Sequence, residues 1–362
     1  MRNLGLDLLR LLAVILVLGR HMRPPEDPSL FMVAWKTGGW VGVDLFFVLS
    51  GFLVSGLLYK AYQRDQALNV KRFLVRRAFK IYPAFYLLLF TTLIVRAFGG
   101  EPILVAPLIG ELLFLQNYLG GLWNHTWSLA VEEHFYLLIA ALFTLLVSRY
   151  KRNNDSDQTR TNPFNKVPHL FVCIALVCLG FRIAAGVTLD HFSYPLLLLG
   201  THIRIDSLMF GVFLSYLWHF RDLEQRIQPI RSIWLVLIGA ALLTPAFIFP
   251  LNDYWLIPII GVTGFYLGSG ALVLAFIRIR QSSNIALVGM GSLGAASYSI
   301  YLWHMAVESW GWDWFTLTTG IIRYEAYFVV YMVGSLVLGW VLSQAVEWPV
   351  LKLRDRLFPR QS

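Results

Sequence analysis

Charged residues and cysteines are both scarce in this chain. Only 14% of its 362 residues are charged and 57% are hydrophobic, whereas soluble domains have about 25% charged residues. This composition excludes an ordinary soluble globular protein. The two cysteines, Cys173 and Cys178, are five positions apart in one apolar segment. On a helix they lie on different faces, which excludes a disulfide between them, and their number excludes a cysteine-based metal motif.

Regular alternation of apolar and polar residues is also missing, which excludes the strands of a membrane β-barrel. No small-residue cleavage site follows the first apolar segment, which Asp7 and Arg10 interrupt. We therefore expect this segment to be retained as a helix and not removed as a signal peptide. We find no internal repeat and no stretch that suits a soluble domain, and we predict a single membrane domain over residues 1–362.

What the chain does contain is a series of long apolar segments. A helix needs about 20 apolar residues to cross a hydrocarbon core of about 30 Å. The segment 103–119 contains Pro107 and Gly110 and is too interrupted to span, so we expect it to be re-entrant or interfacial. We predict an all-α integral membrane protein with about ten transmembrane helices, over residues 6–22, 39–59, 78–98, 126–148, 167–188, 193–218, 231–250, 254–277, 285–307 and 322–345.

The net charge of +9 comes from the short loops between these segments and therefore does not indicate a nucleic-acid partner. If the ten spans are right, 22 of the 30 basic residues lie on one side of the membrane. They occupy Arg2, the loops 60–80, 149–166, 219–231 and 278–280, and the tail 352–360. The positive-inside rule assigns that side to the cytoplasm, with both termini inside.

Five predicted helices place ionisable residues in the same outer layer of the membrane. Exposed to lipid, each would cost about 2.5–3.5 kcal/mol, and a shared water-filled cavity avoids most of that cost. Arg10 and His21 are eleven positions apart, so they share nearly one helix face and lie roughly 16 Å apart along the axis. We predict a ligand that extends between them. The ionisable residues are His21, Asp44, Glu132, Glu133, His134, His202, Arg204, Asp206 and His304.

Each of these residues also has a purely structural interpretation. A histidine near a membrane surface is more often packing than chemistry, and His304 lies in an aromatic run. Because Glu132 and Glu133 are adjacent, we expect only one of them to face the cavity. Four further histidines lie at loop ends, where we expect them to be solvated: His125, His169, His191 and His219.

A basic cluster precedes the third predicted helix. It consists of Arg72, Arg76, Arg77 and Lys80, and the last two are three positions apart, hence on one face. Arginine binds phosphate through two parallel hydrogen bonds, and lysine acts as a point charge. The cluster is therefore a candidate phosphate clamp. The alternative is an interaction with anionic lipid headgroups of the membrane.

The chain resembles the acyltransferase-3 family of integral membrane acyltransferases, which includes bacterial O-acetyltransferases of cell-surface polysaccharides. The family's R-x10-H and R-x-x-R motifs match Arg10 with His21 and Arg77 with position 80, but position 80 is lysine here and lacks the guanidinium fork. Six segments in the right order carry the resemblance, namely Leu6–His21, Gly42–Leu53, Arg77–Pro83, Trp127–Tyr136, Arg204–Gly211 and Ser297–His304.

The resemblance implies an enzyme of the bacterial inner membrane that modifies the cell envelope. An acyl group, usually acetyl, would pass from cytoplasmic acyl-CoA to a hydroxyl of a carbohydrate, a lipid-linked sugar or another extracytoplasmic acceptor, with no metal and no nucleic acid involved. We expect the serine-hydrolase-like domain of some relatives to be absent, so a longer acyl relay would need a separate extracytoplasmic transferase.

In our hypothesis the CoA nucleotide binds Arg72, Arg76, Arg77 and Lys80, and the pantetheine arm passes Arg10. His21 then acts as general base or forms a covalent acyl-imidazole. Asp44 or Glu133 would orient the imidazole. The candidates for binding the acceptor or the oxyanion are Arg204, Asp206, His304 and Ser128.

Two other functions compete with this one. A proton-coupled transporter or flippase could also use a belt of His, Asp and Glu. Such transporters often show inverted repeats and broken helices at the membrane midplane, whereas this chain has no repeat and its charges cluster at one outer level. A membrane scaffold that binds partners through its basic loops would not explain the buried charges.

Overall fold

The computed structural model describes residues 3–153, 162–189, 193–320 and 323–359, and these residues form an all-α membrane protein without strands. Arg2, Arg160, His191 and Arg360 lie outside the described residues. Seven helical segments are long and apolar enough to cross a membrane. They are α3 (Val41–Asp65), α4 (Val70–Gly99), α7 (Trp127–Asn153), α8 (Val167–Thr188), η1 with α9 (Pro195–Leu199 and Thr201–Phe220), η2 with α12 (Ile257–Gly261 and Val262–Phe276), and α16 to α17 (Tyr324–Leu342 and Trp348–Leu357, joined by η4, Ser343–Glu347).

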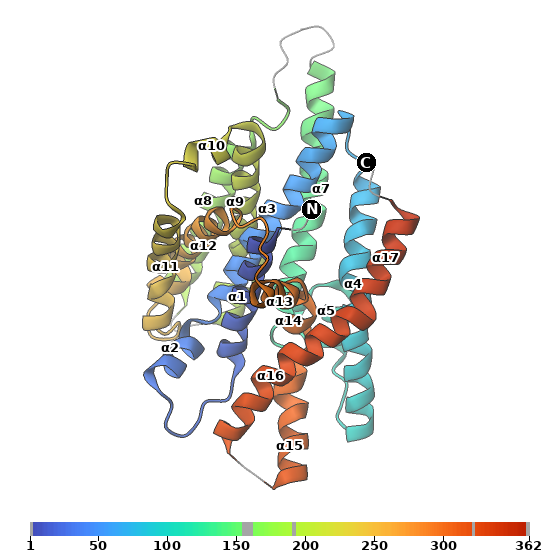
Figure 1. Ribbon diagram of the computed structural model, residues 1–362, viewed down its shortest axis with the longest axis vertical. Coiled ribbons are helices and arrows are strands. Elements are labelled where there is room, and N and C mark those ends of the chain that lie inside the picture. Colours follow the sequence, from blue (N-terminus) through green and yellow to red (C-terminus); the bar gives the residue numbers. More distant parts are fainter. Residues whose placement is uncertain (1–2, 154–161, 190–192, 321–322, 360–362) are drawn as a thin grey trace.

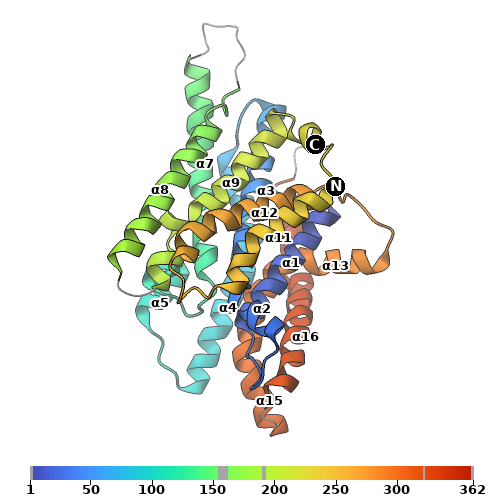
Figure 2. The same cartoon turned by 90° about the vertical axis from the view of Figure 1, so that its left-hand side faces the viewer.

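An eighth candidate span is broken into two parts. Helix α13 (Ile285–Ala295) and the stretch Ser297–Thr319 meet at an angle of 65°. That stretch contains α14 (Ser297–Ala306), η3 (Val307–Gly311) and α15 (Trp312–Thr319). The sequence predicts one span over 285–307. The bend at Ala296 instead turns α13 sideways (Figure 2) and lets α14 run beside α1.

Two further helices accompany these spans. Helix α1 (Leu4–His21) begins at Asn3, whose side chain accepts a hydrogen bond from the Leu6 amide, and it carries three charged residues. Helix α11 (Ser232–Ile248) has 17 residues and packs against α12. Both coincide with predicted spans, but neither is among the candidate spans of the structure. The count of ten transmembrane helices therefore stays a prediction.

Short helices fill the connections. The segment 103–119 forms α5 (Val105–Leu113) and α6 (Gln116–Leu119), which are separated by Phe114 and Leu115, and Phe114 has a left-handed backbone conformation. Helix α2 (Leu30–Gly38), which the sequence analysis did not anticipate, follows α1 and packs against it. Helix α10 (Leu223–Ile227) links α9 to α11.

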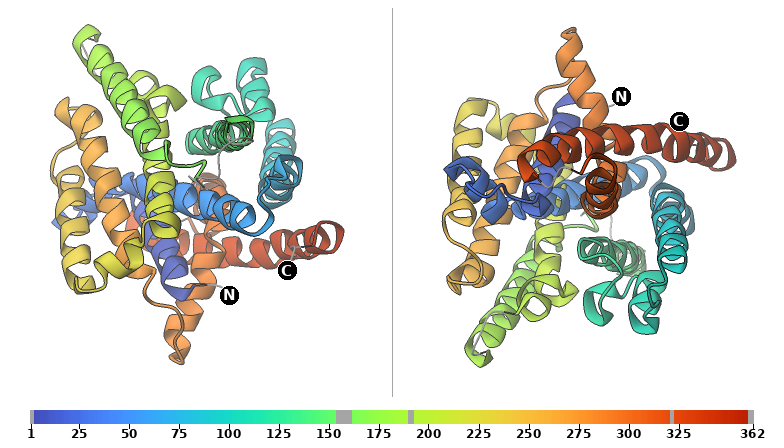
Figure 3. Two further views of the ribbon diagram at one scale, coloured as in Figure 1. Left: turned by 90° about the horizontal axis from the view of Figure 1, so that it is seen from above. Right: turned by 90° about the horizontal axis from the view of Figure 1, so that it is seen from below.

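The helices run mostly up and down in the view of Figure 1. The α3–α4 connection, α10, the start of α1 and the end of α17 lie in the upper half, whereas α2 and α15 lie in the lower part. The upper half therefore holds the predicted cytoplasmic basic loops. Figure 3 shows α16 and α17 crossing the molecule obliquely as one long rod, whose last part packs against α4.

Among the described helices, the most extensive contact joins α3 to α9, and it depends on two glycines. A Cβ atom on Gly51 would lie 2.0 Å from the Leu208 carbonyl oxygen, and one on Gly211 would lie 2.2 Å from the Val48 carbonyl oxygen. The backbones can approach this closely only because neither residue has a side chain. This contact aligns the N-terminal halves of α3 and α9, where their buried charges meet.

Candidate active site

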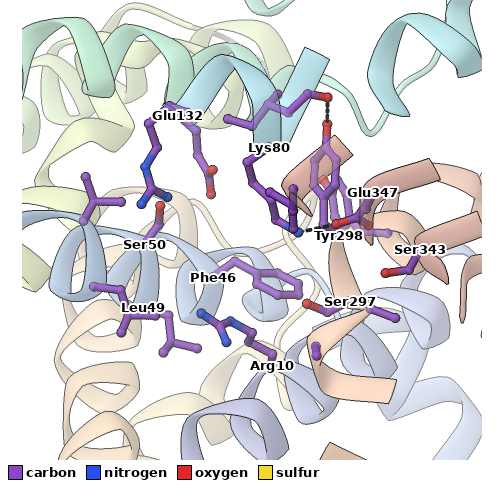
Figure 4. Close-up of a pocket in the computed structure, with 18 of the residues that line it drawn as sticks. Arg10, Phe46, Leu49, Ser50, Lys80, Glu132, Ser297, Tyr298, Ser343 and Glu347 are labelled. Carbon is purple, nitrogen blue, oxygen red and sulfur yellow. Dashed lines mark hydrogen bonds and ion pairs between the residues drawn. The ribbon is translucent and has the colours of Figure 1, made fainter. Parts of the chain in front are cut away.

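A cavity of about 1150 Å³ lies between α1, α3, α4, α7, α14 and the α16–α17 rod. Its volume is slightly above the range of about 300–1,000 Å³ that is usual for small-molecule sites. Phe46 and Leu49 supply an apolar wall from α3, while Arg10, Lys80 and Glu132 surround the same space from α1, α4 and α7 (Figure 4). Toward the end of α17 the lining contains three basic residues, Lys352, Arg354 and Arg356, together with Asp355.

Arg77 lies beside two aromatic rings, Phe73 and Tyr136, of which Tyr136 lines this cavity. Its guanidinium carbon lies 5.8 Å from the Phe73 ring centre and 5.9 Å from that of Tyr136. The Tyr136 hydroxyl donates a 2.7 Å hydrogen bond to Glu132, so this tyrosine is itself fixed. Within the part of the chain that the structure describes, no carboxylate forms an ion pair with Arg77. An anionic ligand can therefore meet this guanidinium without displacing a protein partner.

The rest of the predicted basic cluster is divided between two environments. Lys80 lines the cavity but forms an ion pair with the buried Glu347 of η4, which also accepts a hydrogen bond from Ser299. Arg76 instead binds Asp355 at 2.8 Å, on the flank of α17. Of the five residues predicted to bind the cofactor, Arg10, Arg77 and Lys80 line the cavity, and Arg72 and Arg76 do not.

Arg10 and His21 both belong to α1, as predicted, but they have different neighbours. Arg10 lines the cavity and forms a 2.6 Å ion pair with Asp7. At the other end of the helix, Nδ1 of His21 lies 3.0 Å from Nε2 of His304, and the two ring centres are 5.0 Å apart. The histidine that the sequence analysis placed in an aromatic run is thus a direct partner of His21.

A third histidine completes this cluster. The ring of His125, in the loop before α7, lies 4.8 Å from the ring of His304, and its Nε2 donates to the Leu302 carbonyl at 3.1 Å. The expectation that His125 is solvated is wrong, because the residue is only 1% exposed. Its loop carries no periodic pattern, so nothing in the sequence showed that the ring turns inward. His219 is also partly buried, whereas His169 is exposed.

Tyr301 separates the cavity from the three histidines. Its ring lines the cavity beside Ser128, and the two hydroxyls are 2.6 Å apart. Its backbone carbonyl accepts a hydrogen bond from Nδ1 of His304. None of the three histidines is among the described residues that line the cavity. The cavity therefore ends against Tyr301, one residue layer short of the histidine cluster.

The two carboxylates expected to orient His21 have other partners. Asp44 and Arg204 form a 2.8 Å ion pair, and next to it Asp206 pairs with Arg182 at the same distance. All four side chains are almost completely inaccessible to solvent. On α7, Glu133 accepts a hydrogen bond from Tyr82. Between the described residues there is no hydrogen bond from Asp44 or Glu133 to His21.

Glu111 of α5 holds the loop that carries His125. One carboxylate oxygen accepts hydrogen bonds from the Thr126 hydroxyl at 2.8 Å and the Leu122 amide at 3.1 Å. Helix α5 is outside the candidate spans. Burial raises the pKa of this carboxyl to about 7, against the opposing effect of these hydrogen bonds. The loop is therefore tied to a group that is largely protonated below neutral pH.

We expect Glu111 to make the protein less stable as pH rises. Its folded pKa of about 7 exceeds the unfolded value of 4.5, so its contribution is fully present below the unfolded pKa and is lost as pH rises through the folded pKa. Glu111→Gln keeps an acceptor oxygen and cannot ionise. Melting curves of both proteins in detergent from acidic to mildly alkaline pH should show a steeper fall for the wild type. Parallel falls would exclude Glu111 as the titrating group.

The similarity to known proteins covers most of the chain. The acyltransferase domain family model matches residues 3–344. The O-acetyltransferase OatA of Staphylococcus aureus, from strains NCTC 8325 / PS 47 and COL, is 31% identical over 332 residues, which is 84% of this chain and 50% of the relative. The chain thus spans about half the length of these curated relatives. No solved structure matches it. The match over nearly the whole chain, together with the apolar helices, shows that this multi-pass membrane protein belongs to the acyltransferase-3 family.

Proposed function

We propose that the protein transfers an acetyl group from cytoplasmic acetyl-CoA, or another acyl-CoA, to a hydroxyl of an extracytoplasmic acceptor. The observation that carries this proposal is the cavity lined by Arg10, Arg77 and Lys80, whose far end at Tyr301 is backed by His304 and His21. The family and the O-acetyltransferase relatives support the reaction class. The acceptor class is a sugar or lipid-linked sugar of a bacterial envelope, and a separate extracytoplasmic transferase is the partner for any further relay.

We assign the acyl donor, acetyl-CoA or another acyl-CoA, to the basic part of the cavity. The phosphates of CoA need cations that are accessible and not fully neutralised, and Arg77 meets both conditions. Lys80 contributes a charge that it shares with Glu347. The narrow pantetheine arm then extends past Arg10 toward Tyr301. Arg72 and Arg76 flank this route outside the cavity, where they attract the nucleotide or an anionic lipid headgroup.

The transfer itself needs one group that accepts a proton and returns it. As the acceptor oxygen bonds to the acyl carbon, the hydroxyl proton moves to an imidazole nitrogen of His21. The carbon–sulfur bond breaks, and the thiolate of CoA takes that proton. The products are an ester and CoA thiol, with no net change in protonation of the protein. A path through acyl-imidazole reaches the same products in two steps. Both paths require Tyr301 to move aside.

Arg77→Gln should raise the KM for acetyl-CoA more than it lowers kcat. The variant removes a charged donor from the phosphate site, and a hydrogen bond to a charged group contributes about 1.5–3 kcal/mol, which corresponds to roughly a 10- to 100-fold change. Steady-state kinetics in detergent micelles would measure it. Arg149→Gln is the matched control, because it removes the same charge from the exposed end of α7. Equal KM values for the two variants would place the nucleotide elsewhere.

The test of the function uses purified protein in proteoliposomes with acetyl-CoA labelled in the acetyl group. We expect release of CoA and labelling of an added sugar acceptor, or of His21 if the intermediate is covalent. A proton-coupled transporter would instead move its substrate across the membrane without splitting the thioester. Translocation with intact acetyl-CoA would therefore contradict the proposed function.

A further inference from the structure

His304 lies between a backbone carbonyl and His21. Its Nδ1 contacts the Tyr301 carbonyl at 2.5 Å, and its Nε2 lies 3.0 Å from Nδ1 of His21. The residue is completely buried. Both of its ring nitrogens therefore have a hydrogen-bond partner. One partner is the Tyr301 carbonyl of its own helix, and the other is His21 at the end of α1.

The chemistry of these partners determines where the protons are. A backbone carbonyl only accepts hydrogen bonds, so Nδ1 of His304 must carry a hydrogen. In neutral imidazole the other nitrogen then has a free lone pair and can only accept. It follows that the hydrogen between the two rings belongs to Nδ1 of His21.

The surroundings favour the neutral form of these rings. Among the described residues, the hydrogen-bond partners of His21, His125 and His304 are carbonyls and one another, and no carboxylate is included. A buried imidazolium would have no counter-ion here, and leaving a charge unpaired in the interior is costly. His125 follows the same logic, because its Nε2 donates to the Leu302 carbonyl. Two successive carbonyls of α14 thus fix the protonation of two rings.

We propose that His304 is a positioning residue that holds His21 with its hydrogen on Nδ1, so that Nε2 presents the lone pair used in acyl transfer. The catalytic consequence of this inference rests on the proposed function. The position of the hydrogen on His21 is independent of that function. When Nε2 of His21 takes a proton, its Nδ1–H still donates to Nε2 of His304. His304 therefore does with a neutral acceptor what the aspartate does in a Ser-His-Asp triad, which is to select the tautomer and support the cation.

Two substitutions at this position separate positioning from packing. His304→Asn places an amide where Nδ1 was, which keeps a donor for the Tyr301 carbonyl but cannot reach His21. His304→Gln is longer and places an amide oxygen close to the former Nε2, so it restores an acceptor for His21. The first variant preserves the contact within α14, and the second preserves the contact between α14 and α1. Both remove the aromatic ring.

We expect His304→Asn to lower kcat by up to about 10⁴-fold, the loss that the wrong tautomer causes in a Ser-His-Asp triad, with little change in the KM for acetyl-CoA. His304→Gln should recover part of kcat. If the ring served only packing, the two variants would lose activity and melting temperature together. Wild-type kcat in His304→Asn that melts normally would overturn the proposal.

Nitrogen NMR tests the same inference without activity. In wild-type protein labelled with ¹⁵N-histidine, with His21→Gln used to assign the signal, His21 should show a protonated Nδ1 and an unprotonated Nε2. In His304→Asn the signal should shift toward a mixture of tautomers. A hydrogen on Nε2 of wild-type His21 would overturn the inference even if the enzyme is active. An inactive wild-type protein with the expected tautomer would instead contradict the proposed function alone.

Discussion

His21→Ala is expected to abolish acyl transfer while the protein remains folded in the membrane. The substitution removes the imidazole that receives the acceptor proton, and general acid–base catalysis of this kind contributes about 10²- to 10⁴-fold. If the acyl group is carried covalently, the loss is larger, because no other nucleophile takes its place. Transfer of labelled acetyl by purified variant and wild type, normalised to protein that elutes as a single species, measures the effect.

The control for this experiment is His169→Ala. His169 is an exposed histidine of α8, so the variant changes the same residue type without touching the α1–α14 contact. It should transfer acetyl at the wild-type rate. Full activity in a well-folded His21→Ala protein would remove His21 from the mechanism, and with it the assignment of the cavity end as the acyl-transfer centre.

The sequence could predict which helices carry the site but not how their side chains pair. Arg10 and His21 share a helix, so helical geometry alone placed them at two levels of the membrane. The contact of His21 with His304 joins residues 283 positions apart, and the ion pair of Lys80 with Glu347 joins residues 267 apart. No local pattern encodes such a pairing, because it depends on which helices become neighbours.

The bend before α14 likewise could not be predicted from the sequence. The segment 285–307 has the length and hydropathy of one span, and the sequence offers no proline at the break. The break coincides with close packing of α13 on α1, where a Cβ atom on Gly294 would lie 1.8 Å from the Asp7 carbonyl oxygen. Tertiary contact therefore decides the direction of α13. This bend is also what brings Tyr301 and His304 to the end of the cavity, so the site depends on a feature that composition does not reveal.

Asp44→Ala should be the most destabilising single change among the predicted site residues. Asp44 forms a 2.8 Å ion pair with Arg204, and neither side chain is more than 1% exposed. Its removal leaves the guanidinium buried beside Asp206 and Arg182 without its own counter-ion, in place of the balanced set of two acids and two arginines. Loss of one partner from a buried pair costs about 3–5 kcal/mol. Unfolding in a detergent titration would measure the lost free energy.

Two comparisons show whether this loss comes from the unpaired charge. Asp65→Ala changes the same residue type at the exposed end of α3, where its partner Arg64 is in contact with solvent, and should have little effect on unfolding. The double variant Asp44→Asn with Arg204→Met removes both charges and keeps similar volumes, so no unpaired charge stays buried, which is the costly outcome when one partner alone is lost. It should therefore be more stable than Asp44→Ala alone. If the double variant unfolds as easily as the single one, the instability does not arise from Arg204, and the ion pair is not what joins α3 to α9 at this level.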